Sequence, residues 1–251
     1  MARLIFLQST ESTNTYLHEL LRHEDVEELT AIVTYNQTAG RGQTGNHWDS
    51  EKDKNIALSV LLQPEMDVKE QFGISMAAAL AVTDTLKAYD IESKIKWPND
   101  IYIDIHKVCG ILIENELNGH WVEKSIVGIG LNVNQRHFAE ELKNAMSMVM
   151  ATDKDYDLQD VTRTLTESLC KRYFELLNEG WQSLKKEYML SLVNGGGETH
   201  RFTDVATGEA FEGIIENIEP SGRIVLKKTN GEIVKYYFKE VRQQIGNEER
   251  E

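Results

Sequence analysis

The glycine-rich stretch at residues 39–48, AGRGQTGNHW, constrains the fold of this chain more than any other feature of its sequence. Its glycines have the spacing Gly-x-Gly-x-x-Gly, which also marks dinucleotide-binding folds, where a helix begins at the third glycine. Here the chain continues through Trp48 and a charged turn into residues 55–62, NIALSVLL, an apolar run that predicts a strand. The stretch also lacks the Lys-Ser/Thr pair of a nucleotide P-loop. The sequence therefore disfavours both phosphate-binding folds and places the glycines in a loop between strands.

The composition of this loop suits an anionic ligand. Arg41 supplies a fixed positive charge, and the glycines at positions 40, 42 and 45 leave backbone amides unobstructed as hydrogen-bond donors. A mobile surface loop that binds nothing can have the same composition, so the loop alone leaves both interpretations open.

Length, charge and cysteine content limit the class of protein. The chain has 251 residues and is 41% hydrophobic, which predicts a globular protein with one large domain, or a large domain with a small appendix. Its net charge of −14 argues against nucleic-acid binding. No apolar run approaches the roughly 20 residues that span a bilayer, and the N-terminal apolar run is too short for a signal peptide. We expect no membrane association and a cytoplasmic location, which fits two widely separated cysteines, Cys109 and Cys170.

Apolar periodicity predicts alternating strands and helices, followed by short strands alone. Strands are expected at residues 3–7, 31–35, 55–62, 93–97, 101–103, 107–114 and 122–133, and helices at 12–23, 68–89, 157–178 and 181–193. The pair Asn118-Gly119 predicts a hairpin turn. Four short strands, at 199–203, 210–218, 223–228 and 233–238, have the spacing of a small β-barrel. The predicted fold class is α+β: a mixed sheet flanked by helices, with a small C-terminal barrel.

The same pattern divides the chain into two domains and a tail. The glycine run at 195–197 and the change from helices to short strands place the boundary near residue 195. We expect a large ligand-binding domain at 1–195, a small all-β domain at 196–246 and a disordered tail at 247–251.

Three further polar motifs could contribute to a site. Residues 96–100, KWPND, predict a tight turn that exposes the Asn99 amide and the Asp100 carboxylate at the rim of the sheet, and Lys107 opens an otherwise apolar strand. Residues 128–132, GIGLN, predict a strand that a ligand or another backbone approaches closely. Residues 12–14, Ser-Thr-Asn, would present amides and hydroxyls at a helix N-terminus.

Each of these motifs also has a purely structural explanation. Asn and Asp are ordinary turn formers, a lysine at a strand end is commonly solvated, alternating glycines serve sheet-on-helix packing, and Ser-Thr-Asn caps helices. Catalytic metal or triad chemistry is not indicated: His47, His106 and His120 lack the spacing of metal ligands, no Ser-His-Asp arrangement stands out, and both cysteines fit core positions.

Taken together, in this order and spacing, the motifs resemble those of the biotin–protein ligase family. The resemblance covers nearly the whole chain, and its most specific parts are the glycine–arginine loop and KWPND. The residues that carry it are Ser12-Thr13-Asn14, Gln37, Gly40-Arg41-Gly42 through Trp48, Lys96-Trp97-Pro98-Asn99-Asp100, Lys107-Val108-Cys109-Gly110-Ile111-Leu112 and Gly128-Ile129-Gly130-Leu131-Asn132. The resemblance implies a class II synthetase-like catalytic domain at 1–195 and an SH3-like barrel at 196–246.

The resemblance implies a reaction in two steps. The carboxylate of biotin attacks the α-phosphate of ATP, which gives biotinyl-5′-adenylate and pyrophosphate. The ε-amine of a lysine on a biotin carboxyl carrier protein then attacks the adenylate and releases AMP. Because two anions must be brought together, the chemistry needs fixed cations rather than a nucleophilic side chain. ATP would bring Mg²⁺, with few protein ligands and no separate metal site.

The resemblance also implies a role for each matching residue. Biotin would be bound by Ser12, Thr13, Asn14, Gln37, Arg41, Gly42, Gln43 and Lys107, and ATP would lie against Lys96, Asn99, Asp100 and Asn132. Three of these would carry the chemistry. Arg41 and Lys107 would neutralise the carboxylate and the α-phosphate, and Asp100 would orient the incoming lysine amine or accept its proton.

The sequence departs from the family pattern in two places. Many members carry further basic residues in the loop, where this chain has Gln43, Thr44 and Asn46, so we expect the adenylate to be held less tightly. Eleven residues precede Ser12, too few for a DNA-binding domain, so we expect the monofunctional type, as a monomer or weak homodimer.

Other functions remain as alternatives. A lipoate–protein ligase would share the catalytic fold, but the glycine–arginine loop follows the biotin pattern. A non-catalytic biotin or nucleotide sensor is disfavoured by the retention of Arg41, Asp100 and Lys107. An oxidoreductase would rest on the glycine spacing alone, which the strand after the loop opposes.

Overall fold

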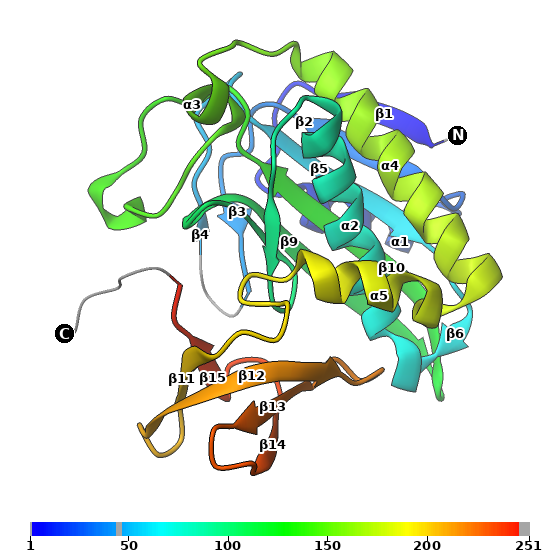
Figure 1. The fold of residues 1–251 in the computed structure, drawn as a ribbon. Helices are drawn as coiled ribbons and strands as arrows, with labels where there is room; N and C mark the ends of the chain where they lie inside the picture. The colour runs from blue at the N-terminus through cyan, green and yellow to red at the C-terminus, as the bar shows by residue number, and fades with distance from the viewer. Residues whose placement is uncertain (1, 44–46, 246–251) are drawn as a thin grey trace.

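The computed structural model describes residues 2–43 and 47–245 and shows a mixed sheet covered by helices, beside a second, smaller sheet (Figure 1). The main sheet has the strand order β1-β2-β5-β10-β9-β8-β7, with β6 paired to the start of β10. β1 and β2 are parallel, whereas the other neighbours are antiparallel. Its strands are β1 (Arg3–Leu7), β2 (Thr30–Thr34), β5 (Ile56–Leu62), β6 (Met66–Asp67), β7 (Lys94–Lys96), β8 (Asp100–Ile103), β9 (His106–Asn118) and β10 (Trp121–Leu131). The predicted α+β class with a mixed sheet is confirmed.

Helices cover both faces of the main sheet. The helices are α1 (Thr13–His23), α2 (Phe72–Ala88), α3 (Met148–Thr152), α4 (Leu158–Glu179) and α5 (Trp181–Ser191). α1 lies on one face, where Leu17 packs with Ile32 of β2 and Leu61 of β5. α2, α4 and α5 lie on the other, where they share a core with Val33 and Val60. The division follows from strand geometry, since neighbouring residues of a strand point to opposite faces.

α2 occupies the centre of the larger core. Its alanine-rich middle is fully buried, and the small side chains allow close packing against the sheet and α4. The predicted helix 68–89 is split in the structure. Asp67 accepts a hydrogen bond from the Lys69 amide at 2.8 Å and caps a 3₁₀ turn at Val68–Glu70, and α2 begins at Phe72. A side chain that satisfies a nearby amide competes with regular helix, which apolar periodicity does not report.

β9 and β10 form a long hairpin through the middle of the sheet. Asn118 pairs with Trp121, so the turn residues are Gly119 and His120, one position later than predicted. Gly119 has a φ of 63°, a conformation that glycine adopts without the steric penalty of a side chain. The register places Gly128 opposite Leu112, and Gly130 opposite Gly110. The glycines of both strands therefore lie close together at the middle of the sheet.

The C-terminal part forms a separate five-stranded antiparallel sheet, with the order β14-β13-β12-β11-β15. Its strands are β11 (His200–Asp204), β12 (Ala210–Ile218), β13 (Ile224–Lys228), β14 (Ile233–Tyr236) and β15 (Val241–Gln243). Side-chain contacts join it to the larger part. The Trp97 indole N–H donates to the Gly222 carbonyl at 3.0 Å, and the Gln243 amide donates to the Val193 carbonyl at 2.9 Å. The division into two domains at residue 195 stays a prediction, and the predicted tail at 247–251 lies outside the described residues.

The sequence patterns missed the shortest elements. These are β15, β6, α3 and a two-stranded hairpin inside the glycine loop, formed by β3 (Gly40–Arg41) and β4 (His47–Trp48). These elements hold few positions to reveal a period, although β7 and β8, which are of similar length, were predicted. Within residues 2–43 and 47–245, no helix is long and apolar enough to cross a membrane.

Candidate active site

A cavity of about 620 Å³ opens beside the middle of the β9–β10 hairpin. Its walls are completed by the N-terminus of α1, the β3–β4 hairpin, residues 138–145, and residues 238–239 in the turn between β14 and β15. The predicted site residues that line it are Ser12, Thr13, Asn14, Gln37, Arg41, Gly42, Gln43, Asp100, Lys107 and Asn132. Segments far apart in the sequence thus meet at one cavity. Gly45, Thr44 and Asn46, which also entered the prediction, lie outside the described residues.

A buried polar network holds the start of α1 against the cavity. Ser12 caps the helix by accepting a hydrogen bond from the Thr15 amide, as the structural explanation of this motif predicts. The next two residues do more than cap. The Thr13 amide donates to Gln37 Oε1 at 2.9 Å, and Ser59 Oγ lies 2.6 Å from Thr13 Oγ1 and 2.5 Å from Asn14 Oδ1. Their polar groups therefore have fixed positions in the cavity wall.

Ser59 was missed by the sequence analysis. It is the single polar residue of β5, whose seven residues are all buried. An isolated serine in a fully apolar strand needs a hydrogen-bond partner, since an unpaired buried hydroxyl is unfavourable. That requirement was the signal in the sequence that could have identified it.

Glu114 is a second residue that the sequence analysis missed. Its carboxylate accepts a hydrogen bond from Asn14 Nδ2 at 2.7 Å and lies 3.5 Å from Arg41 Nη2 and 3.4 Å from His18 Nε2. Arg41, whose side chain is 47% exposed, therefore lies against Glu114 at the edge of the cavity. The Arg41–Glu114 pair contributes little stability at this exposure, and an anionic ligand can compete for the guanidinium.

The glycines of the hairpin make room for Trp48 and Asn14. A Cβ atom at Gly110 would lie 2.8 Å from the Trp48 ring, and one at Gly130 would lie 2.5 Å from its indole nitrogen. A Cβ at Gly128 would collide with the Asn14 carboxamide. The close approach predicted for this strand is thus made by side chains of the cavity. The alternative of sheet-on-helix packing applies to Gly128, which meets Asn14 of α1, and does not explain Gly110 and Gly130, which meet Trp48.

Lys107 and Asp100 form an ion pair in the cavity. Lys107 Nζ lies 2.7 Å from Asp100 Oδ2, and both side chains are half-buried. Lys107 Nζ also lies 5.8 Å from the centre of the Trp48 ring. Lys107 is therefore a partly exposed lysine near the start of β9 with a fixed partner, rather than one that is solvated alone. Nearby, burial raises the pKa of the Cys109 thiol, which fits the predicted core position of this cysteine.

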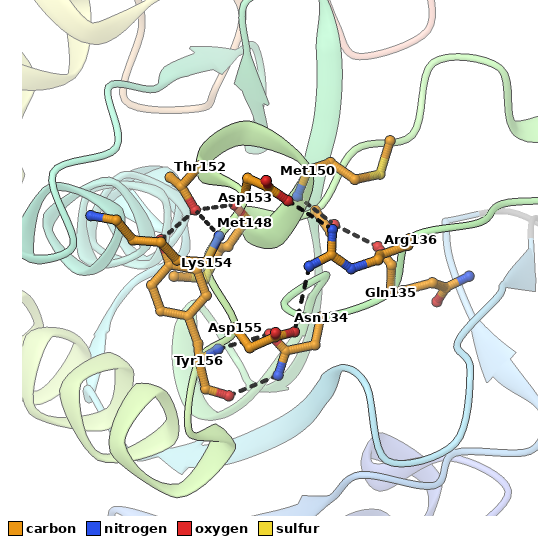
Figure 2. A network of polar contacts seen from close by, with 11 residues as sticks. Asn134, Gln135, Arg136, Met148, Met150, Thr152, Asp153, Lys154, Asp155 and Tyr156 are labelled. Carbon is orange, nitrogen blue, oxygen red and sulfur yellow. Dashed lines mark hydrogen bonds and ion pairs between the residues drawn. The ribbon is translucent and has the colours of Figure 1, made fainter.

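The segment after β10 forms one wall of the cavity. Asn132 joins the two ends of this segment to β9. Its backbone amide donates to the Val108 carbonyl and its side-chain amide donates to the Met146 carbonyl, both at 3.0 Å. Figure 2 shows the network beyond it, in which Arg136 lies between Asp153 and Asp155, at 3.1 and 3.7 Å. Because both ends of the segment are anchored, residues 138–145 form a defined wall.

Two predicted site residues do not line the main cavity. Lys96 lies with its Nζ 5.4 Å from the centre of the Tyr102 ring. Asn99 was expected to be exposed, but it is only 3% exposed. The KWPND turn lies beneath the C-terminal sheet, and Tyr188 of α5 donates to the Pro98 carbonyl at 2.6 Å. Asn99 instead lines a second, smaller cavity.

Comparison with known proteins agrees with this geometry. The model of the biotin/lipoate A/B protein ligase family matches residues 6–132. The bifunctional ligase/repressor BirA of Bacillus subtilis is 31% identical over 242 residues, which cover 95% of this chain and 73% of that protein. The biotin–[acetyl-CoA-carboxylase] ligase of Paracoccus denitrificans is 27% identical over 207 residues, which cover 80% of this chain and 85% of that protein.

A solved structure extends the likeness to the whole fold. The biotin protein ligase from Aquifex aeolicus in complex with biotin and ATP matches with a TM-score of 0.78 at 27% identity, over 98% of this chain and 100% of that chain. The shared fold therefore includes the C-terminal sheet. Because the family model matches residues 6–132 and the Bacillus subtilis protein is similar over 95% of this chain, the chain belongs to the biotin/lipoate A/B protein ligase family.

Proposed function

We propose that this protein is a biotin–protein ligase, which makes biotinyl-5′-adenylate from biotin and ATP and transfers the biotin to a lysine of a biotin carboxyl carrier protein. One observation carries the proposal: a single cavity joins the polar network at Thr13 and Asn14 to the cations Arg41 and Lys107. A neutral polar recognition surface and two fixed cations suit a ligand with a polar head and an anionic end. The relatives named biotin ligases and the Aquifex aeolicus complex with biotin and ATP support the same function.

In the first step, a biotin carboxylate oxygen forms a bond to the α-phosphorus of ATP, and the bond from that phosphorus to pyrophosphate breaks. Lys107 would lie between the two anions, and its contact with the Asp100 carboxylate at 2.7 Å supports this, because it shows that Nζ can hold a carboxylate in the cavity. Arg41 would leave Glu114 for the ligand, which carries more negative charge than one carboxylate. Both cations would stabilise charge that develops on the phosphate oxygens.

In the second step, the lysine amine of the carrier forms a bond to the biotinyl carbonyl carbon, and AMP leaves with the electrons of the broken C–O bond. Asp100 would accept the proton from the amine. Once Lys107 contacts the ligand, the Asp100 carboxylate is left without its cationic partner and can contact the incoming amine.

ATP would bring Mg²⁺ into the cavity. Among the described residues, no group of three or more His, Cys, Asp or Glu side chains is placed to hold a metal ion. The ATP phosphates and water would therefore supply most of the ligands of Mg²⁺. We further propose that the enzyme is cytoplasmic and monofunctional, and that it is a monomer or a weak homodimer. It would bind neither nucleic acid nor membrane.

The proposal is tested by incubating the protein with labelled biotin, MgATP and a biotin carboxyl carrier domain. We expect ATP-dependent label on the carrier, and Lys107→Ala should slow adenylate formation by about 10²–10³-fold. Lys87→Ala is the matched control, because Lys87 is an exposed lysine at the end of α2. Labelling by lipoate and not by biotin would favour the lipoate ligase, and binding of biotin without adenylate formation would favour the sensor.

A further inference from the structure

Glu114 is a negative charge at the edge of a cavity that is proposed to bind anions. Its Oε2 lies 3.5 Å from Nη2 of Arg41, which lines the main cavity. Neither proposed reaction step needs this carboxylate, and like charges repel, so a carboxylate at this place weakens the binding of a phosphate. A residue that opposes binding and has no part in the chemistry requires another explanation.

The carboxylate of Glu114 is held in place by residues of α1. It accepts a hydrogen bond from Asn14 Nδ2 at 2.7 Å, and the Asn14 oxygen in turn accepts one from Ser59 at 2.5 Å. The Asn14 amide cannot turn over, because a carboxylate has no hydrogen to donate to its oxygen. His18 Nε2 lies 3.4 Å from the same Glu114 oxygen. Glu114 therefore keeps its position when Arg41 moves away.

Arg41 is less constrained than Glu114. Its side chain is 47% exposed and lies on the β3–β4 hairpin, in which Gly40 pairs with Trp48 and Arg41 with His47. An exposed ion pair of this kind contributes little free energy, so the guanidinium can exchange one anion for another. A phosphate offers it more negative charge and a second oxygen for a bidentate contact. Two anions, the Glu114 carboxylate and a bound phosphate, thus compete for one cation.

This competition lowers the affinity of the cavity for phosphates. A phosphate that binds Arg41 must first break the Arg41–Glu114 pair, so the free energy of binding is reduced by the free energy of that pair. Exposed ion pairs correspond to a factor of about two to five in an equilibrium constant. Such a factor is useful to a ligase, because the adenylate must be held after the first step and AMP must leave after the second.

We propose that Glu114 is a positioning residue that competes with the bound phosphate for Arg41 and thereby limits how tightly the adenylate and AMP are held. The inference rests on the proposed ligase function. Glu114 holds Arg41 at the edge of the cavity before the ligand binds, gives it up to the phosphate of the adenylate, and takes it back as AMP leaves. The hydrogen bond from Asn14 keeps the carboxylate in its place throughout.

The test uses Glu114→Gln, which removes the charge and keeps an oxygen that can accept from Asn14. We expect the Kd for a non-hydrolysable analogue of biotinyl-5′-adenylate to fall by about two- to fivefold in titration calorimetry, because Arg41 no longer has a competing anion. The Kd for biotin methyl ester, which has no anionic group, should stay within about 1.5-fold, since the contact with Asn14 is retained. Glu116→Gln is the matched control and should change neither Kd, because Glu116 is an exposed glutamate on the same face of β9.

The same substitution in an Arg41→Ala background tests whether Glu114 acts through Arg41. Without the guanidinium there is no cation to compete for, so Glu114→Gln should change the Kd for the adenylate analogue by less than about 1.5-fold. A fall of the same size in both backgrounds would show that Glu114 repels the phosphate directly, which overturns the proposal. An unchanged Kd in Glu114→Gln alone overturns it as well.

Glu114→Asp is a second variant that guards against misfolding of the first. It keeps the charge and withdraws it from Arg41 by the length of a methylene group, so its Kd for the adenylate analogue should lie between those of the wild type and Glu114→Gln. A Kd below that of Glu114→Gln contradicts the proposal. If the wild type binds neither biotin methyl ester nor the adenylate analogue, the ligase function itself fails, and this outcome is distinct from the others.

Discussion

Substituting Gly128 by alanine tests the close contact between β10 and the start of α1. A Cβ at this position would lie 2.9 Å from Cγ and 3.1 Å from Nδ2 of Asn14, so the carboxamide must move. It cannot move freely, because Ser59 Oγ donates to its oxygen at 2.5 Å and its nitrogen donates to the Glu114 carboxylate at 2.7 Å. The substitution therefore breaks this network or shifts the strand.

The expected magnitude follows from those two hydrogen bonds. The bond from Ser59 is between neutral groups, and the bond to Glu114 involves a charge, so losing both lowers the free energy of unfolding by about 2–4 kcal/mol. Since Asn14 is proposed to contact biotin, the Kd for biotin should also rise by tenfold or more.

Urea unfolding of Gly128→Ala, Asn14→Ala and the double variant measures this coupling. Asn14→Ala removes the group with which the new Cβ collides, so the double variant should be no less stable than Asn14→Ala alone. Losses that add, within about 0.5 kcal/mol, would refute the argument that Gly128 is required for this contact.

Four further predictions concern other parts of the molecule. Arg172→Leu should lower the free energy of unfolding by about 3–5 kcal/mol in urea titrations, because its buried guanidinium holds carboxylates from three positions; a loss below 1 kcal/mol contradicts this. The hydrogen bond from Lys235 lowers the pKa of Glu219. Wild type should therefore be more stable than Glu219→Gln above the ordinary glutamate pKa, and this difference should disappear as pH falls through the lowered pKa. A difference in Tm that does not change with pH would contradict this prediction. Lys239→Gly should raise the KM for ATP, because Lys239 lines the main cavity. It should also raise the free energy of unfolding by about 1 kcal/mol, since Lys239 has a φ of 72°, which favours glycine; a lower free energy of unfolding would contradict the second effect. Gln43→Arg should slow dissociation of the adenylate in a filter-binding chase, and an unchanged rate would show that the missing loop cation has no such effect.

The long elements of the fold could be predicted from the sequence. β5 and the strands of the β9–β10 hairpin are apolar runs bounded by turn residues. α4 begins at Leu158 and is capped by Asp157, whose side chain accepts from the amides of residues 159 and 160. Their patterns are local, so no knowledge of the rest of the chain is needed. β15 could not be predicted, because a three-residue strand exists only through its pairing with β11.

The site was predictable only in part, for a similar reason. Lys107, Arg41 and the glycines stand out from their neighbours as unusual residue types. Ser59 also stands out, as the one polar residue of an apolar strand, but its partners Thr13 and Asn14 are distant in the sequence and could not be predicted. Glu114 does not stand out, because its importance comes from distant partners alone. The burial of Asn99 beneath the C-terminal sheet is likewise a tertiary property, and the turn chemistry of KWPND gives no indication of it.

The β9–β10 hairpin also bears on the order in which the site forms during folding. A two-residue turn joins its strands, so pairing Gly110 with Gly130 closes a short loop at a small cost in chain entropy. The contact between Asn14 and Glu114 spans 100 residues and must close a far longer loop. We expect the floor of the main cavity, with Lys107 at its edge, to be organised before the α1 and Arg41 walls arrive. A nascent chain would then carry half of its substrate site before it can bind substrate.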